Sequence, residues 1–183
     1  GRPLRGDLSV PLLHPWSFVP RALATQTTMP TCLLGVIADT HGLLRPDALE
    51  ALAGVELILH GGDVGHPDVL SGLQAVAPVV AIRGNVDVEP WARALAPTEL
   101  VTRAGVTCYL VHRIADLDID PRSAGVSVVI YGYSHQPTLE WRGDVLYLNP
   151  GSAGPKRFRL PTTVAKMALA RGAVAGVTFV TLP

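Results

Sequence analysis

Residues 33–42 read LLGVIADTHG, and this stretch decides the fold of the chain. Its apolar run, residues 33–38, is short and ends at Asp39, which is typical of a strand buried on both faces. The carboxyl ends of such strands form the ligand-binding crevice of open α/β sheets, and here Asp39 and His41 follow directly. The stretch therefore predicts an α/β fold with polar chemistry at the end of its first strand.

The residues that follow continue an alternation of helix and strand. Helices are predicted at 46–52, where a proline occupies the first turn, and at 67–76. Apolar runs at 55–60 and 78–82 predict two further buried strands. Strands joined by single short helices lie parallel with right-handed crossovers, so this half of the chain predicts a βαβαβ unit.

The second half of the chain predicts hairpins instead of crossovers. Three short turns that contain glycine separate pairs of apolar runs, which is the pattern of antiparallel neighbours. Hairpins after a βαβ half indicate a mixed sheet that faces a second sheet, with helices outside. The predicted strands are 100–103 with 106–112, then 126–131, then 139–141 with 145–148, and 163–170 with 173–181.

Composition narrows the class of protein. The 183 residues suit one domain, and 15 basic residues balance 15 acidic ones. This balance argues against nucleic acid as a bulk partner and against a membrane-surface protein, and no apolar stretch is long enough to span a bilayer. Cys32 and Cys108 lack metal or redox spacing, which favours a reduced, cytoplasmic protein. The oligomeric state stays open, a homo-oligomer included.

Residues 1–28 differ from the rest, with four prolines and neither helical nor strand periodicity. They predict an N-terminal arm whose origin stays open between cloning-derived residues, read-through, a genuine arm and a weak likeness to a transit peptide. His14 in this arm is expected to be exposed. Met29 precedes the first strand pattern, so the predicted domain is 29–183.

Metal-ligand residue types recur at the ends of the predicted strands. Glycines accompany them and permit close approach of the backbone, as in the Gly61-Gly62 and Gly84 motifs. Because the strand ends share one rim, we expect these side chains to converge. Carboxylate and imidazole together suit manganese, iron or zinc better than calcium. The candidate metal ligands are Asp39, His41, Asp63, Asn85, His112 and His135.

Each of these residues also has a purely structural interpretation. Aspartate and asparagine after a strand often cap a helix or shape a turn, and a single strand-end histidine is often structural. His60 lies within a predicted strand and is expected in the core or in a supporting position, whereas His66 is expected to be exposed. Repetition of the pattern at every strand end favours the metal site.

The order of the motifs resembles the calcineurin-like metallophosphoesterase superfamily. The late Asn-Pro-Gly-Ser turn at 149–152 is similar to the small bacterial and archaeal phosphodiesterase branch. The resemblance spans residues 33 to about 182. The motifs that carry it are Asp39-x-His41, Gly62-Asp63, Gly84-Asn85, His112 and Gly132-x-x-His135.

The resemblance implies a four-layer α-β-β-α sandwich of two mixed sheets, with a metal site at the carboxyl ends of the strands. One or two divalent ions (Mn, Fe, Ni or Zn) would activate hydroxide to attack a small phosphate ester, most simply a phosphodiester. Asp63, Asn85 and His112 are the residues expected to serve catalysis. The resemblance assigns Asp39, His41, Asp63 and His135 to the first ion, and Asp63, Asn85 and His112 to the second.

Two departures from the family pattern bear on the second ion. Tyr133 replaces a histidine ligand, and Arg113 follows His112 where the family has glycine. Val86 also stands where cysteine or histidine is common. Tyr133 is expected to be either a neutral donor to phosphate or a deprotonated ligand. Arg113 either faces solvent or places its guanidinium near the weakened position.

Two functions remain in competition at this stage. The first is a metal-dependent phosphoric ester hydrolase, a phosphodiesterase or phosphatase. The alternative is a catalytically weak member of the family that uses the fold to bind a protein partner, as the retromer subunit with this fold does. An exposed apolar patch away from the metal rim would favour that scaffold.

Overall fold

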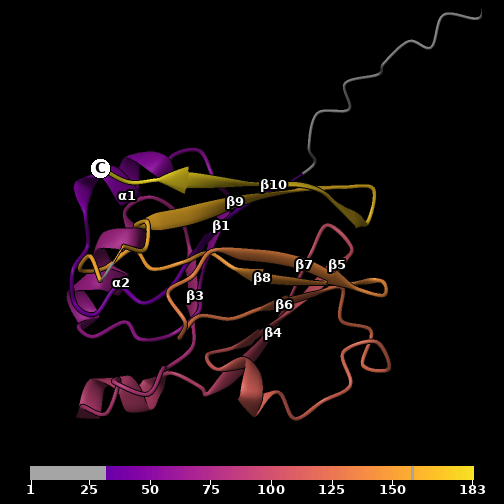
Figure 1. Ribbon diagram of the computed structural model, residues 1–183, viewed down its shortest axis with the longest axis horizontal. Coiled ribbons are helices and arrows are strands. Elements are labelled where there is room, and N and C mark those ends of the chain that lie inside the picture. Colours follow the sequence, from indigo (N-terminus) through magenta and orange to yellow (C-terminus); the bar gives the residue numbers. More distant parts are fainter. Residues whose placement is uncertain (1–31, 158) are drawn as a thin grey trace, which may run out of the picture.

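The computed structural model describes residues 32–157 and 159–183, and within them the chain forms two mixed five-stranded sheets (Figure 1). The predicted arm, with His14, lies outside the described residues, so the domain boundary stays a prediction. In the first sheet the strands β1, β2 and β3 are parallel, and β9 and β10 join antiparallel at one side. Its order is β10 (Ala173–Thr181), β9 (Thr163–Ala170), β1 (Cys32–Ile37), β2 (Leu57–His60) and β3 (Val79–Ala81).

The second sheet is also mixed, with parallel pairing in the middle and antiparallel pairing at both edges. All three predicted hairpins are present, two of them at the edges of this sheet. The mixed two-sheet sandwich is therefore confirmed. The strand order is β4 (Thr98–Arg103), β5 (Val106–Val111), β6 (Val128–Ile130), β8 (Val145–Asn149) and β7 (Thr138–Arg142).

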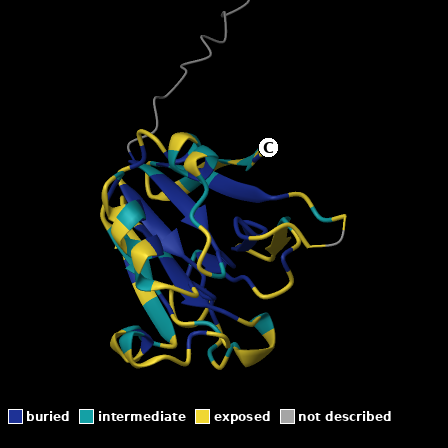
Figure 2. Ribbon diagram, turned by 90° about the vertical axis from the view of Figure 1, so that its left-hand side faces the viewer, coloured by how far each residue is buried: buried dark blue, intermediate teal, exposed yellow. Residues whose placement is uncertain are grey.

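The main hydrophobic core lies between the two sheets. Alternate side chains of each strand enter it, such as Leu34 and Val36 of β1 from one side and Leu110 of β5 from the other. The central strands are buried on both faces, as Figure 2 shows for the inner strands. This double burial is the reason why the central strands read as continuous apolar runs. Cys32 and Cys108 are free thiols in this core.

The outer faces of the two sheets are covered differently. The helices α1 (Pro46–Ala51) and α2 (Pro67–Gln74) pack on the first sheet and complete a second core. The outer face of the second sheet contacts Ile114, Leu117 and Ile119, and the segment that carries them forms only one 3-10 turn, η2 (Ile114–Asp116). This segment, with η2 as its helical part, forms the outer layer on the second sheet.

The boundaries of the predicted elements agree with the structure to within two residues. Val55 belongs to the predicted second strand, but β2 begins two residues later. The side chain of Val55 is buried in the core with the helices, while its backbone is not part of the β-sheet pairing. The 3-10 helix η1 (Pro90–Ala94) was not predicted. No helix in the described part of the chain is long and apolar enough to cross a membrane.

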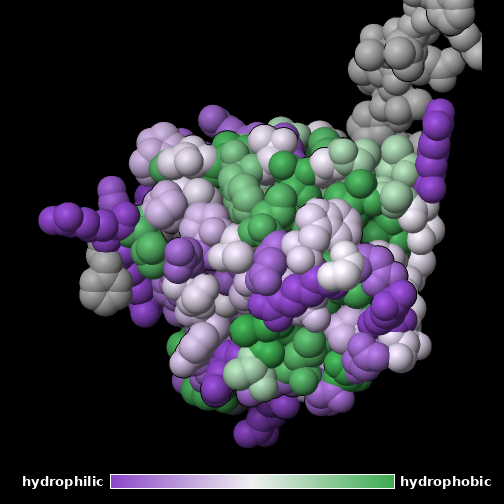
Figure 3. Space-filling model, turned by 45° about the vertical axis from the view of Figure 1, so that its right-hand side comes forward, coloured by the Kyte–Doolittle hydropathy of each residue, from purple (hydrophilic) through white to green (hydrophobic). Residues whose placement is uncertain are grey.

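The edge strands β7 and β10 of the two sheets border an apolar pocket of about 180 Å³. Val174 and Val177 line it from β10, and Leu139 and Trp141 line it from β7. Leu139 is 44% exposed and Trp141 is 57% exposed. Figure 3 shows hydrophobic areas reaching the surface on the side of the molecule where the hairpin turns lie.

Candidate metal centre

The six candidate metal ligands lie together at the carboxyl ends of five strands. Two follow β1, and the others follow β2, β3, β5 and β6, one for each strand. The two sheets present these ends at the same edge of the sandwich, so one crevice receives all of them. The side chains at this edge are Asp39, His41, Asp63, Asn85, His112 and His135.

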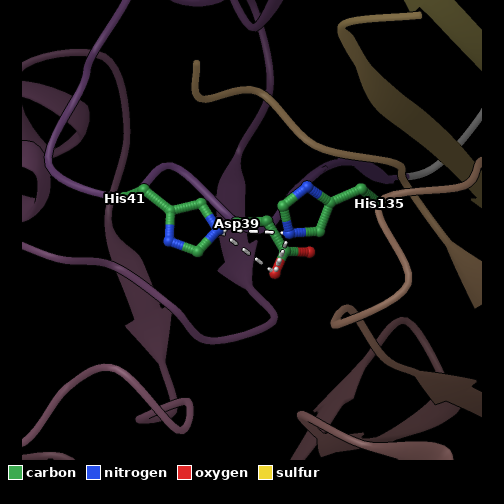
Figure 4. Close-up of side chains that lie close together, drawn as sticks. All are labelled: Asp39, His41 and His135. Carbon is green, nitrogen blue, oxygen red and sulfur yellow. Dashed lines mark hydrogen bonds and ion pairs between the residues drawn. The ribbon is translucent and has the colours of Figure 1, made fainter. Parts of the chain in front are cut away.

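One group of donors forms around Asp39, His41 and His135 (Figure 4). The Nε2 atoms of the two histidines lie 3.1 Å apart. Asp39 Oδ1 is 3.4 Å from Nε2 of His135 and 4.0 Å from Nε2 of His41. Two imidazole nitrogens and a carboxylate oxygen that face one point form the start of a coordination shell for a divalent ion.

A second group of donors forms around Asp39, Asp63 and His112. Nε2 of His112 lies 3.3 Å from Asp63 Oδ2 and 3.1 Å from Asn85 Oδ1. Its Nδ1 is 2.8 Å from the carbonyl oxygen of Gly61, to which it donates. That hydrogen bond directs Nε2 toward the carboxylates, as second-shell carbonyls do for metal-binding histidines.

Both carboxylates lie between the two groups. Asp39 belongs to each group, and Asp63 Oδ2 also reaches His41 at 4.0 Å while it contacts His112. Asp63 Oδ1 is held by the amide of Val86 at 3.0 Å. The donor set of two carboxylates, three imidazoles and an amide oxygen fits divalent manganese, iron, nickel or zinc.

The protonation of these residues also fits a cation site. Burial lowers the pKa of His112, but the hydrogen bonds to Asp63 and to the Gly61 carbonyl outweigh it and raise the pKa overall. Burial raises the pKa of Asp63. The hydrogen bonds from His112 and from the Val86 amide lower it by more, so the pKa is lowered overall. Both shifts have the same cause, the close contact between the His112 imidazole and the Asp63 carboxylate.

The loops of the centre use a backbone conformation that is rare outside glycine. Left-handed residues turn the chain sharply after β1, β2 and β6, where the loops enter the crevice. Backbone hydrogen bonds hold two of these loops together, since the Asp39 amide donates to Gly62 and the His41 amide donates to Asp63. The left-handed residues are Asp39 (φ 53°), His41 (φ 47°), Asp63 (φ 54°), Tyr133 (φ 68°) and His135 (φ 59°).

Asp87 supports the centre and was missed by sequence reasoning. Its buried carboxylate accepts hydrogen bonds from the amides of Val64, Gly65 and Gly84 at 3.0, 2.7 and 2.7 Å. It thereby ties the loop after β2, which carries Asp63, to the loop after β3. The spacing of two residues from Asn85 was the available indication in the sequence.

The Asn-Pro-Gly-Ser turn has a structural role that its sequence did not reveal. The side-chain amide of Asn149 donates to the carbonyl of Gly132 at 2.8 Å and to Ser134 Oγ at 3.0 Å. The hydroxyl of Ser152 donates to the carbonyl of Asp39 at 2.9 Å. The turn therefore fixes the loops that carry Asp39 and His135.

The other two described histidines lie where the sequence predicted. His60 is fully buried in β2, and burial lowers its pKa to about 4, so it is neutral. Its Nδ1 accepts from the Gly62 amide at 3.2 Å, and its Nε2 lies 3.0 Å from Thr40 Oγ1. His66 is exposed and caps α2 by accepting from the Asp68 amide.

The two departures from the family pattern form one cluster at the rim. The Tyr133 ring is 52% exposed and lies edge-on to His112, with centroids 5.9 Å apart. The guanidinium of Arg113 lies 5.1 Å from the centre of that ring and 3.6 Å from Asp116. Arg113 is exposed, as the solvent-facing interpretation predicted. The backbone amide of Tyr133 donates to Asp39, so its peptide supports the centre.

A fold of two mixed sheets with this donor set at the strand ends defines a metal-dependent phosphoester hydrolase, since paired divalent ions stabilise phosphoryl transfer. Residues 33–172 match the calcineurin-like phosphoesterase superfamily domain. The chain belongs to that superfamily, as the motif order indicated.

Individual proteins also resemble the chain, in sequence or in fold. A probable metallophosphoesterase of Methanothermobacter thermautotrophicus is 35% identical over 151 residues, 72% of this chain and 83% of the relative. Phosphodiesterase YfcE of Escherichia coli is 29% identical over 139 residues, 63% of this chain and 76% of YfcE. The structure of Vps29 from Chaetomium thermophilum shares the fold, with a TM-score of 0.66 at 19% identity over 82% of this chain and 97% of Vps29.

Proposed function

We propose that the protein is a phosphodiesterase that hydrolyses small phosphate diesters with a metal-activated hydroxide. The observation that carries this proposal is that two groups of metal donors adjoin each other, with Asp39 in both and with Asp63 within 4.0 Å of a histidine of each. Two ions held by such adjoining groups would suit in-line displacement at phosphorus. The similarity to phosphodiesterase YfcE supports a diester as the substrate.

The ligand assignment follows the family pattern onto this geometry. We assign Asp39, His41, Asp63 and His135 to the first ion. We assign Asn85 and His112, with Asp63 as the shared ligand, to the second. The distances from Asp63 Oδ2 to both His41 and His112 support a bridging role for this residue.

Backbone groups of the chain position the ligands of the proposed ions. When bound, the ions supply a hydroxide near neutral pH and positive charge for the phosphoryl oxygens. The Gly61 carbonyl fixes the ring of His112, and the Val86 amide holds Asp63 in place. Asn85 is exposed at the rim beside His112, where its side-chain oxygen would hold an ion and its N–H groups would be available to donate to a phosphate oxygen.

The finer features of the proposal rest on the chemistry of the chain. The mixture of carboxylate and imidazole supports manganese as the working ion. The two buried free thiols support a cytoplasmic, reducing location. Zero net charge supports a small phosphate ester as the partner, with neither nucleic acid in bulk nor a membrane surface involved.

A protein-binding scaffold is the second candidate function. Leu139 and Trp141 are exposed beside the apolar pocket, and this patch lies on β7, away from the metal ligands. Exposed apolar patches often mark protein interfaces. The complete donor set of the first position and the presence of Asn85 beside His112 favour the enzyme.

Metal analysis paired with a phosphodiester assay separates the two functions. We expect the protein to bind manganese and to hydrolyse bis(p-nitrophenyl) phosphate with one or more of manganese, nickel, iron and zinc. Chelation should abolish the activity, and manganese should restore it. If the protein binds metal but hydrolyses the diester with none of these four ions, the result would favour the scaffold.

The two metal positions should differ in affinity. Tyr133 replaces one imidazole of the second position, and a phenol must lose its proton before it binds a metal, whereas a neutral imidazole need not. We expect calorimetric titration with manganese to give one strong site and one weaker site. Two equally tight sites would contradict the assignment of a weakened second position.

Restoring the imidazole should strengthen the second position. Tyr133→His places a neutral donor beside His112, and we expect tighter binding of a second manganese with about tenfold faster diester hydrolysis, or about 1.4 kcal/mol of barrier. Tyr133→Phe is the control, because it removes the hydroxyl without adding a ligand. A slower Tyr133→His enzyme without extra metal would make Tyr133 an active participant.

A further inference from the structure

A cavity of about 380 Å³ adjoins the metal centre on the side of Asn85 and His112. Its walls come from the loop after β3, the start of β4 and the segment after β5. The volume lies within the range of small-molecule sites, about 300–1,000 Å³. Because Asn85 and His112 line both the cavity and the centre, a phosphate at the centre directs one of its ester groups here.

The charges of this cavity balance. Arg83 and Arg113 face it with Asp116 and Asp118, and Arg113 pairs with Asp116 at 3.6 Å. Among residues 32–157 and 159–183, neither Arg83 nor Asp118 has a side chain of opposite charge within ion-pair distance. A second phosphate would need an excess of positive charge, and an ammonium group would need an excess of negative charge. The cavity has neither, which favours a neutral polar ligand.

Asp118 is held in a fixed position. The hydroxyl of Tyr109 donates to Asp118 Oδ1 at 3.0 Å. Tyr109 is buried in β5, and burial raises the pKa of its phenol, so the hydroxyl keeps the proton that it donates. The second carboxylate oxygen of Asp118 then remains as an acceptor for a ligand. The buried Tyr109 thus holds the exposed Asp118 carboxylate in place as a hydrogen-bond acceptor at the cavity.

We infer that this cavity, here named the Asp118 pocket, binds a neutral, hydroxyl-bearing ester group of the substrate, such as glyceryl or a sugar. A hydroxyl both donates and accepts, so one diol satisfies Asp118 and Arg83 together. A plain alkyl group of the same size would displace water from these charges without replacing its hydrogen bonds, which is costly. The inference rests on the proposed phosphodiesterase function and names its substrate class.

The opposite side of the centre has a different character. A smaller cavity of about 140 Å³ lies beside His135 and is lined by Tyr133 and Arg157, with no carboxylate among its lining residues. The larger, charge-balanced Asp118 pocket is therefore the side that suits the hydroxylated group. The two ester groups of a diester are distinguished by this asymmetry.

Two diesters with the same leaving group test the inference. p-Nitrophenyl glyceryl phosphate and p-nitrophenyl propyl phosphate share their leaving group and differ in their hydroxyls. The 2-hydroxyl of the glyceryl group can itself attack phosphorus and release p-nitrophenol with a cyclic phosphate, so hydrolysis is measured as the open-chain glyceryl or propyl phosphate formed, after subtraction of a blank that contains manganese without protein. We expect the manganese-loaded protein to prefer the glyceryl ester by about tenfold in kcat/KM, since a site built to bind hydroxyls rejects analogues that lack them. Asp118→Ala should reduce this preference to about one.

Asp144→Ala is the matched control. Asp144 is also an exposed aspartate, but it lies in the β7–β8 turn and pairs with Arg122 at 3.6 Å, outside the metal centre. Its replacement should leave the tenfold preference unchanged. Equal rates for the two esters in the unmodified protein, or an unchanged preference in Asp118→Ala, would overturn the inference.

A binding measurement separates this inference from the proposed function. If neither diester is hydrolysed with any metal, the phosphodiesterase proposal fails, and calorimetry with glyceryl phosphate and propyl phosphate still tests the pocket. Tighter binding of glyceryl phosphate to the manganese-loaded protein, lost in Asp118→Ala, would support the hydroxyl-binding pocket. Equal affinity for the two phosphates would reject it.

Discussion

Asp63→Asn is expected to lower phosphodiester hydrolysis by about a thousandfold, equivalent to about 4 kcal/mol of barrier. Asp63 contacts His112 at 3.3 Å and lies 4.0 Å from His41, which supports its proposed role as the ligand shared by two ions. Asparagine keeps the shape but removes the charge that a divalent ion requires. Its amide would also present N–H groups where an ion needs an oxygen.

The measurement is manganese affinity by calorimetry together with the hydrolysis rate. Both should fall, while the thermal unfolding midpoint of the metal-free protein changes little. Asp68→Asn is the control, because Asp68 is an aspartate on the exposed surface of α2. Normal metal content with retained activity in Asp63→Asn would place the bridging ligand elsewhere.

Gly84→Ala is expected to lower activity by about a hundredfold, comparable to the loss of a supporting contact at a metal site. A methyl group at Gly84 would collide with the carboxylate and the backbone nitrogen of Asp63. The Gly84 amide also donates to Asp87 at 2.7 Å, so the loop has little freedom to move away. The collision displaces Asp63 or the loop that carries Asn85.

Gly176→Ala in β10 is the matched control for this variant. No atom lies within 4 Å of a methyl group at Gly176, which is remote from the metal ligands. Activity and manganese affinity should fall in Gly84→Ala and stay constant in Gly176→Ala. Full activity in Gly84→Ala would show that Asp63 tolerates displacement, against the tight geometry described above.

The strand ends were predictable because burial leaves a strong pattern in the sequence. A central strand such as β1 is buried on both faces, so its apolar run has to stop where the chain leaves the core. Asp39 marks that point, and the same reasoning located Asp63, Asn85, His112 and His135. Because parallel strands bring their carboxyl ends to one edge, the convergence of these residues also followed from the order of the elements.

The outer layer of the second sheet was not predictable in the same way. Its cover consists of Ile114, Leu117 and Ile119 on an irregular segment. Three apolar residues spaced over a loop have neither the helical nor the strand period on which sequence reasoning depends. The helical part of this layer is the single 3-10 turn η2, which is too short to leave a period in the sequence.

By itself the sequence determined the two-sheet fold, the family and the set of residues at the metal edge, because each depends on patterns along the chain. The tertiary structure alone decided which neighbours hold those residues. Asp87 joins two loops, Asn149 supports the loop of His135, and Tyr109 orders Asp118 beside the centre. These contacts link residues on different strands and loops, and left-handed turns direct the side chains at the centre. Such geometry comes from packing in three dimensions, which no periodicity along the chain encodes.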